Sequence, residues 1–329
     1  MSVTEPRAVA ASQAGAESPL DGFRADRVYL GADHARNERR TRLAAVICVV
    51  SLAVQVGGGF AFNSMALIAG GLHMAGHVAA LVVAAGAYAV ARRFAADRRF
   101  SFGTGKIGYL AAFANAVVLA ATAVAVLAES VERIFKDPEI GYDGALALAG
   151  LGLVINLGCA WLLRPSRTAH HHDEVGDLNL SVAHLHLTAD AVVSALAILG
   201  LAAGRLLGWV WADAAAGVLG ALLIGHFAYN LLKRAAAVLL DMNPSATLAE
   251  EVRARLEAEG GRVVDLHLWR LGPGHHAAIA VVSVDTPRTP EAFRARLAGL
   301  AGISHLTVEV RVSEPIRADA ALTRKRASV

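Results

Sequence analysis

Long apolar runs and short polar connectors alternate over the first 240 residues. A helix that crosses a bilayer needs about 20 predominantly apolar residues. Six runs reach that length, at residues 43–62, 65–91, 107–127, 145–163, 180–203 and 209–232. They predict an all-α domain of six transmembrane helices over residues 41–240. Residues 1–40 hold no comparable run and are rich in Ala, Ser and charged side chains, so we expect a disordered cytoplasmic N-terminal tail.

The pattern changes after residue 240, where apolar positions recur in short segments among many charged ones. Their spacing predicts, in chain order, a helix at 247–260, strands at 262–271 and 275–286, a helix at 289–300 and a strand at 305–312. These elements form a small cytoplasmic α+β domain over residues 241–313, followed by a C-terminal tail at 314–329. A domain of about 70 residues has a small core, which favours association with a second copy.

Composition and charge place the chain in a membrane. Hydrophobic residues make up 55% of its 329 residues and charged residues 18%, which is too apolar for an ordinary soluble domain. Thirteen Arg and Lys residues flank the runs on one side, against three on the other, Arg133, Lys136 and Arg205. Because basic connectors stay in the cytoplasm, we expect both termini there. The prediction is an integral protein of a bacterial inner (plasma) membrane, in contact with the lipid bilayer and with no nucleic-acid partner.

The two cysteines, Cys48 and Cys159, both lie in apolar runs. Nothing in their placement indicates a disulfide framework or a cysteine-based zinc site. A metal site in this chain would therefore need histidine and carboxylate ligands.

Two pairs of polar residues interrupt the apolar runs at helical spacing. His73 and His77 lie four residues apart in the second run, and His186 and Asp190 lie four apart in the fifth. Residues four apart share one helix face, so each pair can bind one ion. An unpaired carboxylate is costly within a bilayer, and a divalent transition-metal ion would compensate Asp190. We therefore expect the four residues to form one tetrahedral site.

The other histidines carry weaker signals. His184 and His226 lie singly within apolar runs, where a hydrogen bond to a neighbouring helix is the simpler interpretation. The run of His170, His171 and His172 suits a solvated loop as well as a metal-collecting one. The predicted cytoplasmic domain has four histidines that are either ordinary surface residues or ligands of a second metal site: His267, His275, His276 and His305.

Two functions of other classes also use histidines in a membrane protein. A membrane di-iron oxygenase or desaturase gathers many histidines at the cytosolic ends of its helices, whereas His73 and His77 lie well inside a predicted span. Iron content and an O₂-dependent product would indicate such an enzyme. A membrane-tethered metal sensor would bind an ion without moving it, and flux measurements would separate it from a transporter.

Five segments follow one another along most of the chain in a specific combination. They are NSMALIAGGLHMAGH at 63–77, RRFSFGTGK at 98–106, LHLTADAVVSALAIL at 185–199, WADAAAGVLGALLI at 211–224 and VVDLHLWRLGPGHH at 263–276. Together they resemble the signatures of the cation diffusion facilitator family. The resemblance implies a homodimer with six membrane helices per protomer and a cytoplasmic ferredoxin-like domain similar to a metallochaperone.

The resemblance also implies a function and a site. The family exports divalent metal from the cytoplasm in exchange for protons, with no enzymatic reaction and no prosthetic group. By position, its transport site falls on His73, His77, His186 and Asp190. Most zinc-transporting members carry Asp where this chain has His77, and the H-x-x-x-H variant resembles the branch associated with cobalt and nickel efflux. Co²⁺ and Ni²⁺ are therefore the expected substrates. Zn²⁺ is the alternative, because ligand type alone does not separate Zn²⁺ from Co²⁺ and Ni²⁺.

Further departures from the family concern sites outside the membrane. Phe100 and Thr104 stand where histidines of some members form an interfacial metal site, which leaves only Asp97 in that connector. Val264 and Ala280 occupy positions often held by histidine in the cytoplasmic domain. These departures from the family pattern imply that the interfacial site is absent. They also argue against a preformed binuclear site in the cytoplasmic domain.

The expected ligands couple metal to protons. Metal needs neutral histidine and ionised aspartate, so binding expels protons and protonation expels metal. The ordinary pKa of histidine, about 6.5, places this competition in the physiological range. A pH gradient then drives efflux if the helices alternate between inward-open and outward-open forms, as the family resemblance implies.

Overall fold

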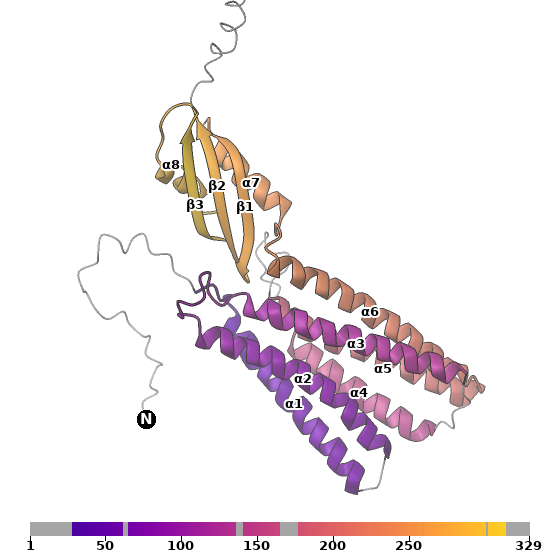
Figure 1. The fold of residues 1–329 in the computed structure, drawn as a ribbon. Coiled ribbons are helices and arrows are strands. Elements are labelled where there is room, and N and C mark those ends of the chain that lie inside the picture. The colour runs from indigo at the N-terminus through magenta and orange to yellow at the C-terminus, as the bar shows by residue number, and fades with distance from the viewer. Residues whose placement is uncertain are drawn as a thin grey trace, which may run out of the picture.

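The computed structural model describes residues 28–61, 65–135, 141–164, 177–258, 260–300 and 302–313, except for the side chains of residues 55, 58–61 and 65–74. In this part of the chain, a bundle of long helices carries a small sheet domain at one end (Figure 1). The bundle contains α1 (His34–Ala61), α2 (Met65–Arg93), α3 (Ile107–Ile134), α4 (Tyr142–Leu162), α5 (Leu178–Leu207) and α6 (Trp211–Leu239). The sheet domain contains α7 (Ala246–Glu257), β1 (Arg262–Gly272), β2 (His275–Val284), α8 (Pro290–Leu297) and β3 (Ile303–Val312).

Five helices in the described residues are long and apolar enough to cross a membrane. They are the Ala75–Arg93 part of α2 and the whole of α3, α4, α5 and α6. Both α3 and α6 continue past the predicted runs, because charged residues such as Arg133 and Lys233 extend each helix beyond its apolar stretch. The first predicted run, 43–62, falls on α1, and its crossing of the membrane stays a prediction.

Small residues let the membrane helices approach one another closely. A Cβ atom at Gly200 of α5 would lie 2.8 Å from the backbone oxygen of Ala212 of α6, a distance that side chains do not tolerate. A Cβ atom at Gly220 of α6 would lie 3.2 Å from the side chain of Val193 of α5. Close van der Waals packing of this kind is the main attraction between helices in lipid. It fixes α5 against α6, while α4 also packs against α5.

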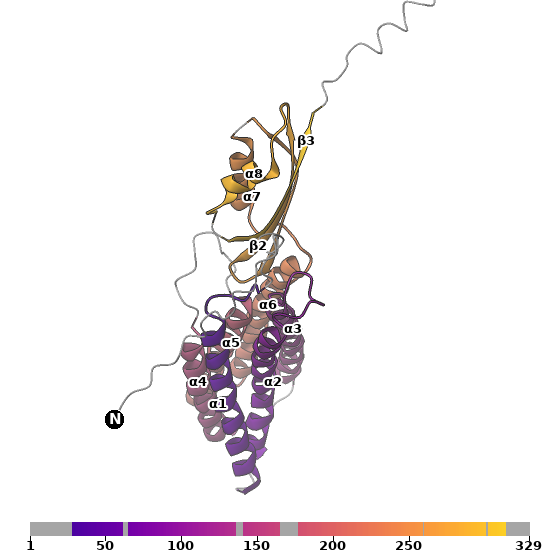
Figure 2. The same cartoon turned by 90° about the vertical axis from the view of Figure 1, so that its left-hand side faces the viewer.

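The sheet domain has strand order β1-β2-β3, with β1 antiparallel to β2 and β2 parallel to β3. Its elements follow the predicted order of helix, strand, strand, helix and strand. Figure 2 shows α7 and α8 together on one face of the sheet. Their apolar side chains, among them Leu248, Val252 and Phe293, are buried in one core cluster with residues of the strands. The ferredoxin-like classification of this domain stays a prediction.

The described part of the N-terminal region is ordered. α1 begins at His34, and Tyr29 is 3% exposed in a cluster with Leu271 and Ala277 of the sheet domain. The expectation of a disordered tail over residues 1–40 is therefore wrong for residues 28–40. The physical reason is that one buried aromatic side chain anchors this segment without producing any hydrophobic periodicity along it.

Three further contacts lie where the sheet domain meets the bundle. Lys106, just before α3, forms an ion pair with Asp241, which follows α6. Phe102 lies edge-on to both Trp269 and His305, with ring centroids 5.6 Å apart in each pair. The connector between α2 and α3 therefore holds the sheet domain against the end of the bundle.

Candidate metal centre

Asp177 determines where α5 begins, and α5 carries two of the predicted ligands. The Asp177 carboxylate accepts a hydrogen bond from the backbone N–H of Leu180 at 3.2 Å, as an N-cap residue does. The helix then continues without a break to Leu207. His186 and Asp190 consequently lie one turn apart on one face of α5, and both are buried.

Buried amides hold α2, which carries the other predicted ligands, against its neighbours. Asn179 of α5 donates to the Ala84 carbonyl of α2 at 2.9 Å, and Asn115 of α3 donates to the Ala80 carbonyl at 3.1 Å. Hydrogen bonds between membrane helices contribute about 0.6–2 kcal/mol each. Because both carbonyls lie within two turns of His77, these bonds set the position of His77 relative to α5.

A second hydrogen-bond network ties the ligand-bearing helices together at the end of the bundle near the sheet domain. Tyr88 of α2 donates its hydroxyl to Asp177 Oδ2 at 2.5 Å, and Asn37 of α1 donates to the same oxygen at 2.8 Å. Tyr88 lies three turns after His77. Sequence reasoning missed this network, although an Asp directly before an apolar helical run is a recognisable N-cap signal.

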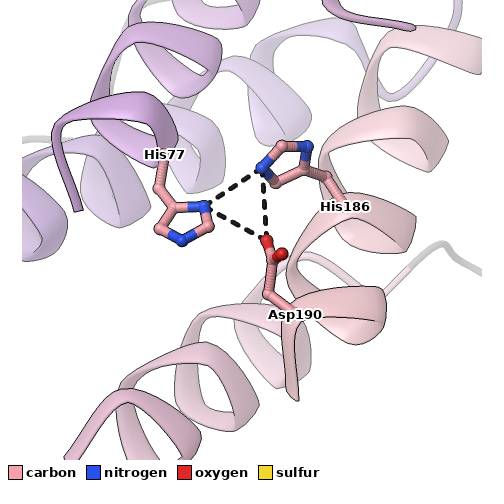
Figure 3. Close-up of side chains that lie close together, drawn as sticks. All are labelled: His77, His186 and Asp190. Atoms are coloured by element: carbon pink, nitrogen blue, oxygen red, sulfur yellow. Dashed lines mark hydrogen bonds and ion pairs between the residues drawn. The ribbon is translucent and has the colours of Figure 1, made fainter. Parts of the chain in front are cut away.

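Figure 3 shows that His77, His186 and Asp190 converge between α2 and α5. His77 Nδ1 lies 3.0 Å from His186 Nε2 and 3.1 Å from Asp190 Oδ2. His186 Nε2 lies 3.2 Å from the same carboxylate oxygen. The three residues are 4%, 9% and 7% exposed, respectively. Among the described residues, this triad is the one group of three or more potential metal ligands whose donor atoms come together.

The triangle of donor atoms has the dimensions that a transition-metal ion requires. At metal–ligand distances of about 2.0–2.1 Å, an ion about 1 Å above the triangle reaches all three atoms, with angles of about 100° at the metal. These angles lie between the octahedral and tetrahedral values, so one side of the ion stays open to further ligands. Two imidazole nitrogens and one carboxylate oxygen suit Co²⁺, Ni²⁺ and Zn²⁺ alike.

The convergence of the triad also has an electrostatic consequence. Its three donor atoms lie within 3.2 Å of one another, and their lone pairs repel unless a proton or a cation lies among them. The Asp190 carboxylate, moreover, needs a compensating positive charge in apolar surroundings. A proton and a metal ion can each meet both demands, so they compete for the same atoms.

Comparison with known proteins connects this bundle to a family. Residues 41–240 match the family model described as the cation efflux transmembrane domain. The chain belongs to the cation diffusion facilitator family. The chain is therefore an integral membrane protein of a transporter family, for which metal ions are transported substrates and not prosthetic groups.

Several cation diffusion facilitators are similar over most of their length. The metal cation efflux system protein CzcD of Cupriavidus metallidurans is 32% identical over 304 residues, which cover 89% of this chain and 94% of CzcD. The cadmium, cobalt and zinc/H(+)-K(+) antiporter of Bacillus subtilis is 27% identical over 84% of this chain and 91% of its own length. The zinc transporter ZitB of Escherichia coli is 33% identical over 72% of this chain and 74% of its own length.

The fourth residue of the predicted transport site is His73, which lies on α2 one turn before His77. Its side chain lies outside the described residues. The structure thus brings together three of the four predicted ligands, and the complete set stays a prediction. The run of His170, His171 and His172 also lies outside the described residues.

The remaining histidines of the membrane domain have nearby partners. His184 Nδ1 lies 2.9 Å from the Ala160 carbonyl of α4, which confirms the predicted contact with a neighbouring helix. His226 Nε2 lies 3.0 Å from the Asn230 amide on the same helix, so the prediction of an interhelical bond is wrong for this residue. Neither histidine belongs to the triad.

The histidines of the sheet domain face different partners. His267 Nε2 lies 2.9 Å from a carboxylate oxygen of Asp265 on an exposed part of β1. His275 Nδ1 lies 2.7 Å from the Ser304 hydroxyl, while His276 is buried at 1% exposure. Within the described residues, no three metal-binding side chains of this domain bring their donor atoms together.

Polar residues of the connector between α2 and α3 form hydrogen bonds within the connector and to the end of α2. Arg99 Nη2 and Nε lie 2.8 and 3.1 Å from Asp97 Oδ2, and these hydrogen bonds lower the pKa of the Asp97 carboxyl. Thr104 donates its hydroxyl to the Ala91 carbonyl at 2.7 Å. The absence of an interfacial metal site at this connector stays a prediction from the family comparison.

Proposed function

We propose that this protein exports divalent transition-metal cations from the cytoplasm in exchange for protons, and that His77, His186 and Asp190, together with His73, bind the ion. The convergence of two imidazoles and a carboxylate inside an apolar bundle carries the proposal. Ionisable side chains are costly within a membrane and mark ion pathways there. We infer transport rather than catalysis because the family is one of transporters.

Co²⁺ and Ni²⁺ are the substrates that we propose. The reason is His77, which supplies nitrogen at a position where, by the family resemblance, most zinc-transporting members carry a carboxylate. A site with more imidazole and less carboxylate favours metals that bind nitrogen strongly, and affinity for nitrogen ligands rises from Co²⁺ to Ni²⁺ in the divalent series. The donor triangle accepts either ion at ordinary bond lengths.

The charge of the triad supports exchange for protons. With a divalent ion and one carboxylate, the loaded triad has a single net positive charge, whereas the empty triad has a single negative one. A proton on either histidine makes the empty triad neutral, which is its least costly state in apolar surroundings. Metal binding displaces that proton, and protonation displaces the metal.

We further propose the family's assembly for this chain. Two copies form a homodimer in the inner (plasma) membrane, with six helices each and both termini in the cytoplasm. The excess of Arg and Lys at one set of helix ends supports this orientation. In that orientation the sheet domain lies in the cytoplasm, at the side from which the metal enters.

Metal uptake by proteoliposomes under an imposed pH gradient tests the proposal. We compare Co²⁺, Ni²⁺, Zn²⁺, Mn²⁺ and Fe²⁺, and we expect Co²⁺ and Ni²⁺ uptake that rises with the gradient and is lost in Asp190→Asn. The matched control is Asp143→Asn, which makes the same change at a carboxylate that is 84% exposed near the start of α4. Uptake that ignores the gradient would refute proton exchange, and binding without uptake would indicate a metal sensor.

A zinc-preferring exporter is the second candidate. The zinc transporter ZitB is among the similar proteins, and the triad also suits a tetrahedral Zn²⁺ ion. Uptake of Zn²⁺ and Co²⁺ from an equimolar mixture separates the two candidates. An excess of Zn²⁺ in the vesicles would select the zinc exporter.

A further inference from the structure

The two cysteines of the chain lie in contact between α1 and α4. Cys48 Sγ and Cys159 Sγ are 3.9 Å apart, although 111 residues separate them in the sequence. Both side chains are buried, at 0% and 1% exposure. Sequence analysis gave these residues no role, and neither belongs to the triad.

We propose that Cys48 and Cys159 form a second metal site, separate from the triad, for a thiophilic divalent cation such as Cd²⁺. Thiolate sulfur binds soft metal ions in preference to hard ones. Two thiolates on one tetrahedral zinc ion, with zinc–sulfur bonds of about 2.3 Å, lie about 3.8 Å apart, and the longer bonds of the larger Cd²⁺ ion place them slightly farther apart. The observed separation of 3.9 Å matches that spacing, so both sulfurs can bind one ion with little movement of the helices.

Charge balance selects a divalent ion for this pair. Binding releases one proton from each thiol, so two thiolates and one divalent cation make a neutral complex. A monovalent ion would leave one net negative charge in the interior of the bundle, where uncompensated charge is costly. Apolar residues such as Leu81 and Leu187 pack around the pair, and His77 of the triad lies near enough to Cys159 to interact with it electrostatically.

Asn156 supplies an independent indication of a ligand at this place. It is 3% exposed, and its Oδ1 atom has no hydrogen-bond partner among the described residues. Asn156 and Cys159 are three residues apart on α4 and share its buried face. An unpaired amide oxygen is costly in such surroundings. We assign it as the third donor to the ion that the two sulfurs hold.

The cysteine site lies beside the proposed path of the transported metal. Leu81, in the same cluster as the thiols, lies one turn after His77 on α2, and Leu187 directly follows His186 on α5. An ion that reaches the interior of the bundle thus comes near both sites. The proposal stands on its own geometry and does not depend on the transport function.

Absorption spectroscopy of the reduced, full-length protein during Cd²⁺ titration tests the site. Sulfur-to-cadmium charge-transfer absorption requires thiolate ligands, which the triad lacks, and the chain holds no other cysteine. We expect this absorption to saturate at one Cd²⁺ per chain. Cys48→Ser and Cys159→Ser should each weaken the binding by at least about tenfold. Asn156→Leu should weaken it while the sulfur absorption persists at saturation.

Ser130→Ala is the matched control, because it changes a small, buried polar residue of α3 that is not part of this cluster. It should leave the cadmium absorption unchanged. Absence of charge-transfer absorption in the wild type, with two free thiols counted per chain, would overturn the site without any variant having to fold. Two cysteines already joined as a disulfide in protein purified under reducing conditions would overturn it as well. Unchanged Cd²⁺ affinity in Asn156→Leu would overturn the third donor.

Discussion

Replacement of Asp190 by Asn removes the negative charge of the triad while it keeps the size and shape of the side chain. In the wild type, the Asp190 carboxylate oxygen lies 3.1 Å from His77 Nδ1 and 3.2 Å from His186 Nε2. All three residues are at least nine-tenths buried. The variant therefore leaves two neutral imidazoles that can still contact a metal ion, but nothing in the triad to balance its charge.

The size of the effect follows from that charge. A bound divalent ion leaves one uncompensated positive charge in the wild-type triad and two in the variant. One such charge at the centre of a membrane helix costs about 3 kcal/mol. Since 1.4 kcal/mol is a factor of ten in affinity, Asp190→Asn should weaken metal binding about a hundredfold.

The stability of the protein should change much less than its affinity for metal. A carboxylate and an imidazolium about 3 Å apart attract each other by about 5 kcal/mol at an effective dielectric constant of about 20. Burial of two charged groups in the membrane costs a similar amount, about 3 kcal/mol each. The variant loses both effects together, so its melting temperature should stay within a few degrees of the wild type.

Calorimetric titration with Co²⁺ in two buffers of different ionisation enthalpy gives both the affinity and the number of protons released. We expect about one proton per ion from the wild type and none from Asp190→Asn, whose empty triad has no negative charge for a proton to balance. Asp143→Asn should match the wild type in both quantities. Wild-type affinity in Asp190→Asn, with its fold intact, would refute the assignment of Asp190 as the anionic ligand.

Three further predictions concern selectivity, domain organisation and the network around Asp177. In His77→Asp, exchange of nitrogen for oxygen should raise the ratio of Zn²⁺ to Co²⁺ uptake, measured by competitive flux across a pH series. Truncation after residue 243 should weaken dimerisation and flux yet preserve metal binding in the membrane, measured by equilibrium dialysis. Tyr88→Phe removes a hydrogen bond to a charged group, worth about 1.5–3 kcal/mol, and should lower the melting temperature by a few degrees.

Each of these predictions has a contradicting outcome. An unchanged metal ratio in His77→Asp would mean that this residue does not set selectivity. Complete loss of membrane-site binding on truncation would show that the sheet domain contributes to the triad or to its assembly. For the network, the matched control is Tyr229→Phe, at a tyrosine that is 65% exposed. Equal melting temperatures for the Tyr88 and Tyr229 variants would show that the contact with Asp177 adds no stability.

Local patterns predicted much of the structure because helix and strand periodicity depend on near neighbours. The pairing of His186 with Asp190 followed from their spacing, and the structure places both on one buried face of α5. The run at 107–127 predicted α3, but not its extension to Ile134, since charged turns continue a helix without leaving an apolar signal.

These local patterns could not predict contacts between segments that are distant in the sequence. The approach of Cys48 to Cys159 depends on how α1 packs against α4, and helix–helix packing admits several arrangements for the same apolar faces. Tyr29 likewise gives no sign in the sequence that it packs on Leu271, some 240 residues away. By contrast, the meeting of His77 with the two ligands of α5 was predicted from the two pairs at helical spacing and from the cost of an unpaired Asp190 within a bilayer, and the family resemblance implied the same site.

Anomalous X-ray scattering from crystals of the full-length protein soaked with Co²⁺ tests the central claim most directly, because it locates the ion itself. We predict an anomalous peak about 2 Å from His77 Nδ1, His186 Nε2 and Asp190 Oδ2, and its loss in Asp190→Asn. A cobalt peak confined to the histidines of the sheet domain, with none between α2 and α5, would contradict the claim.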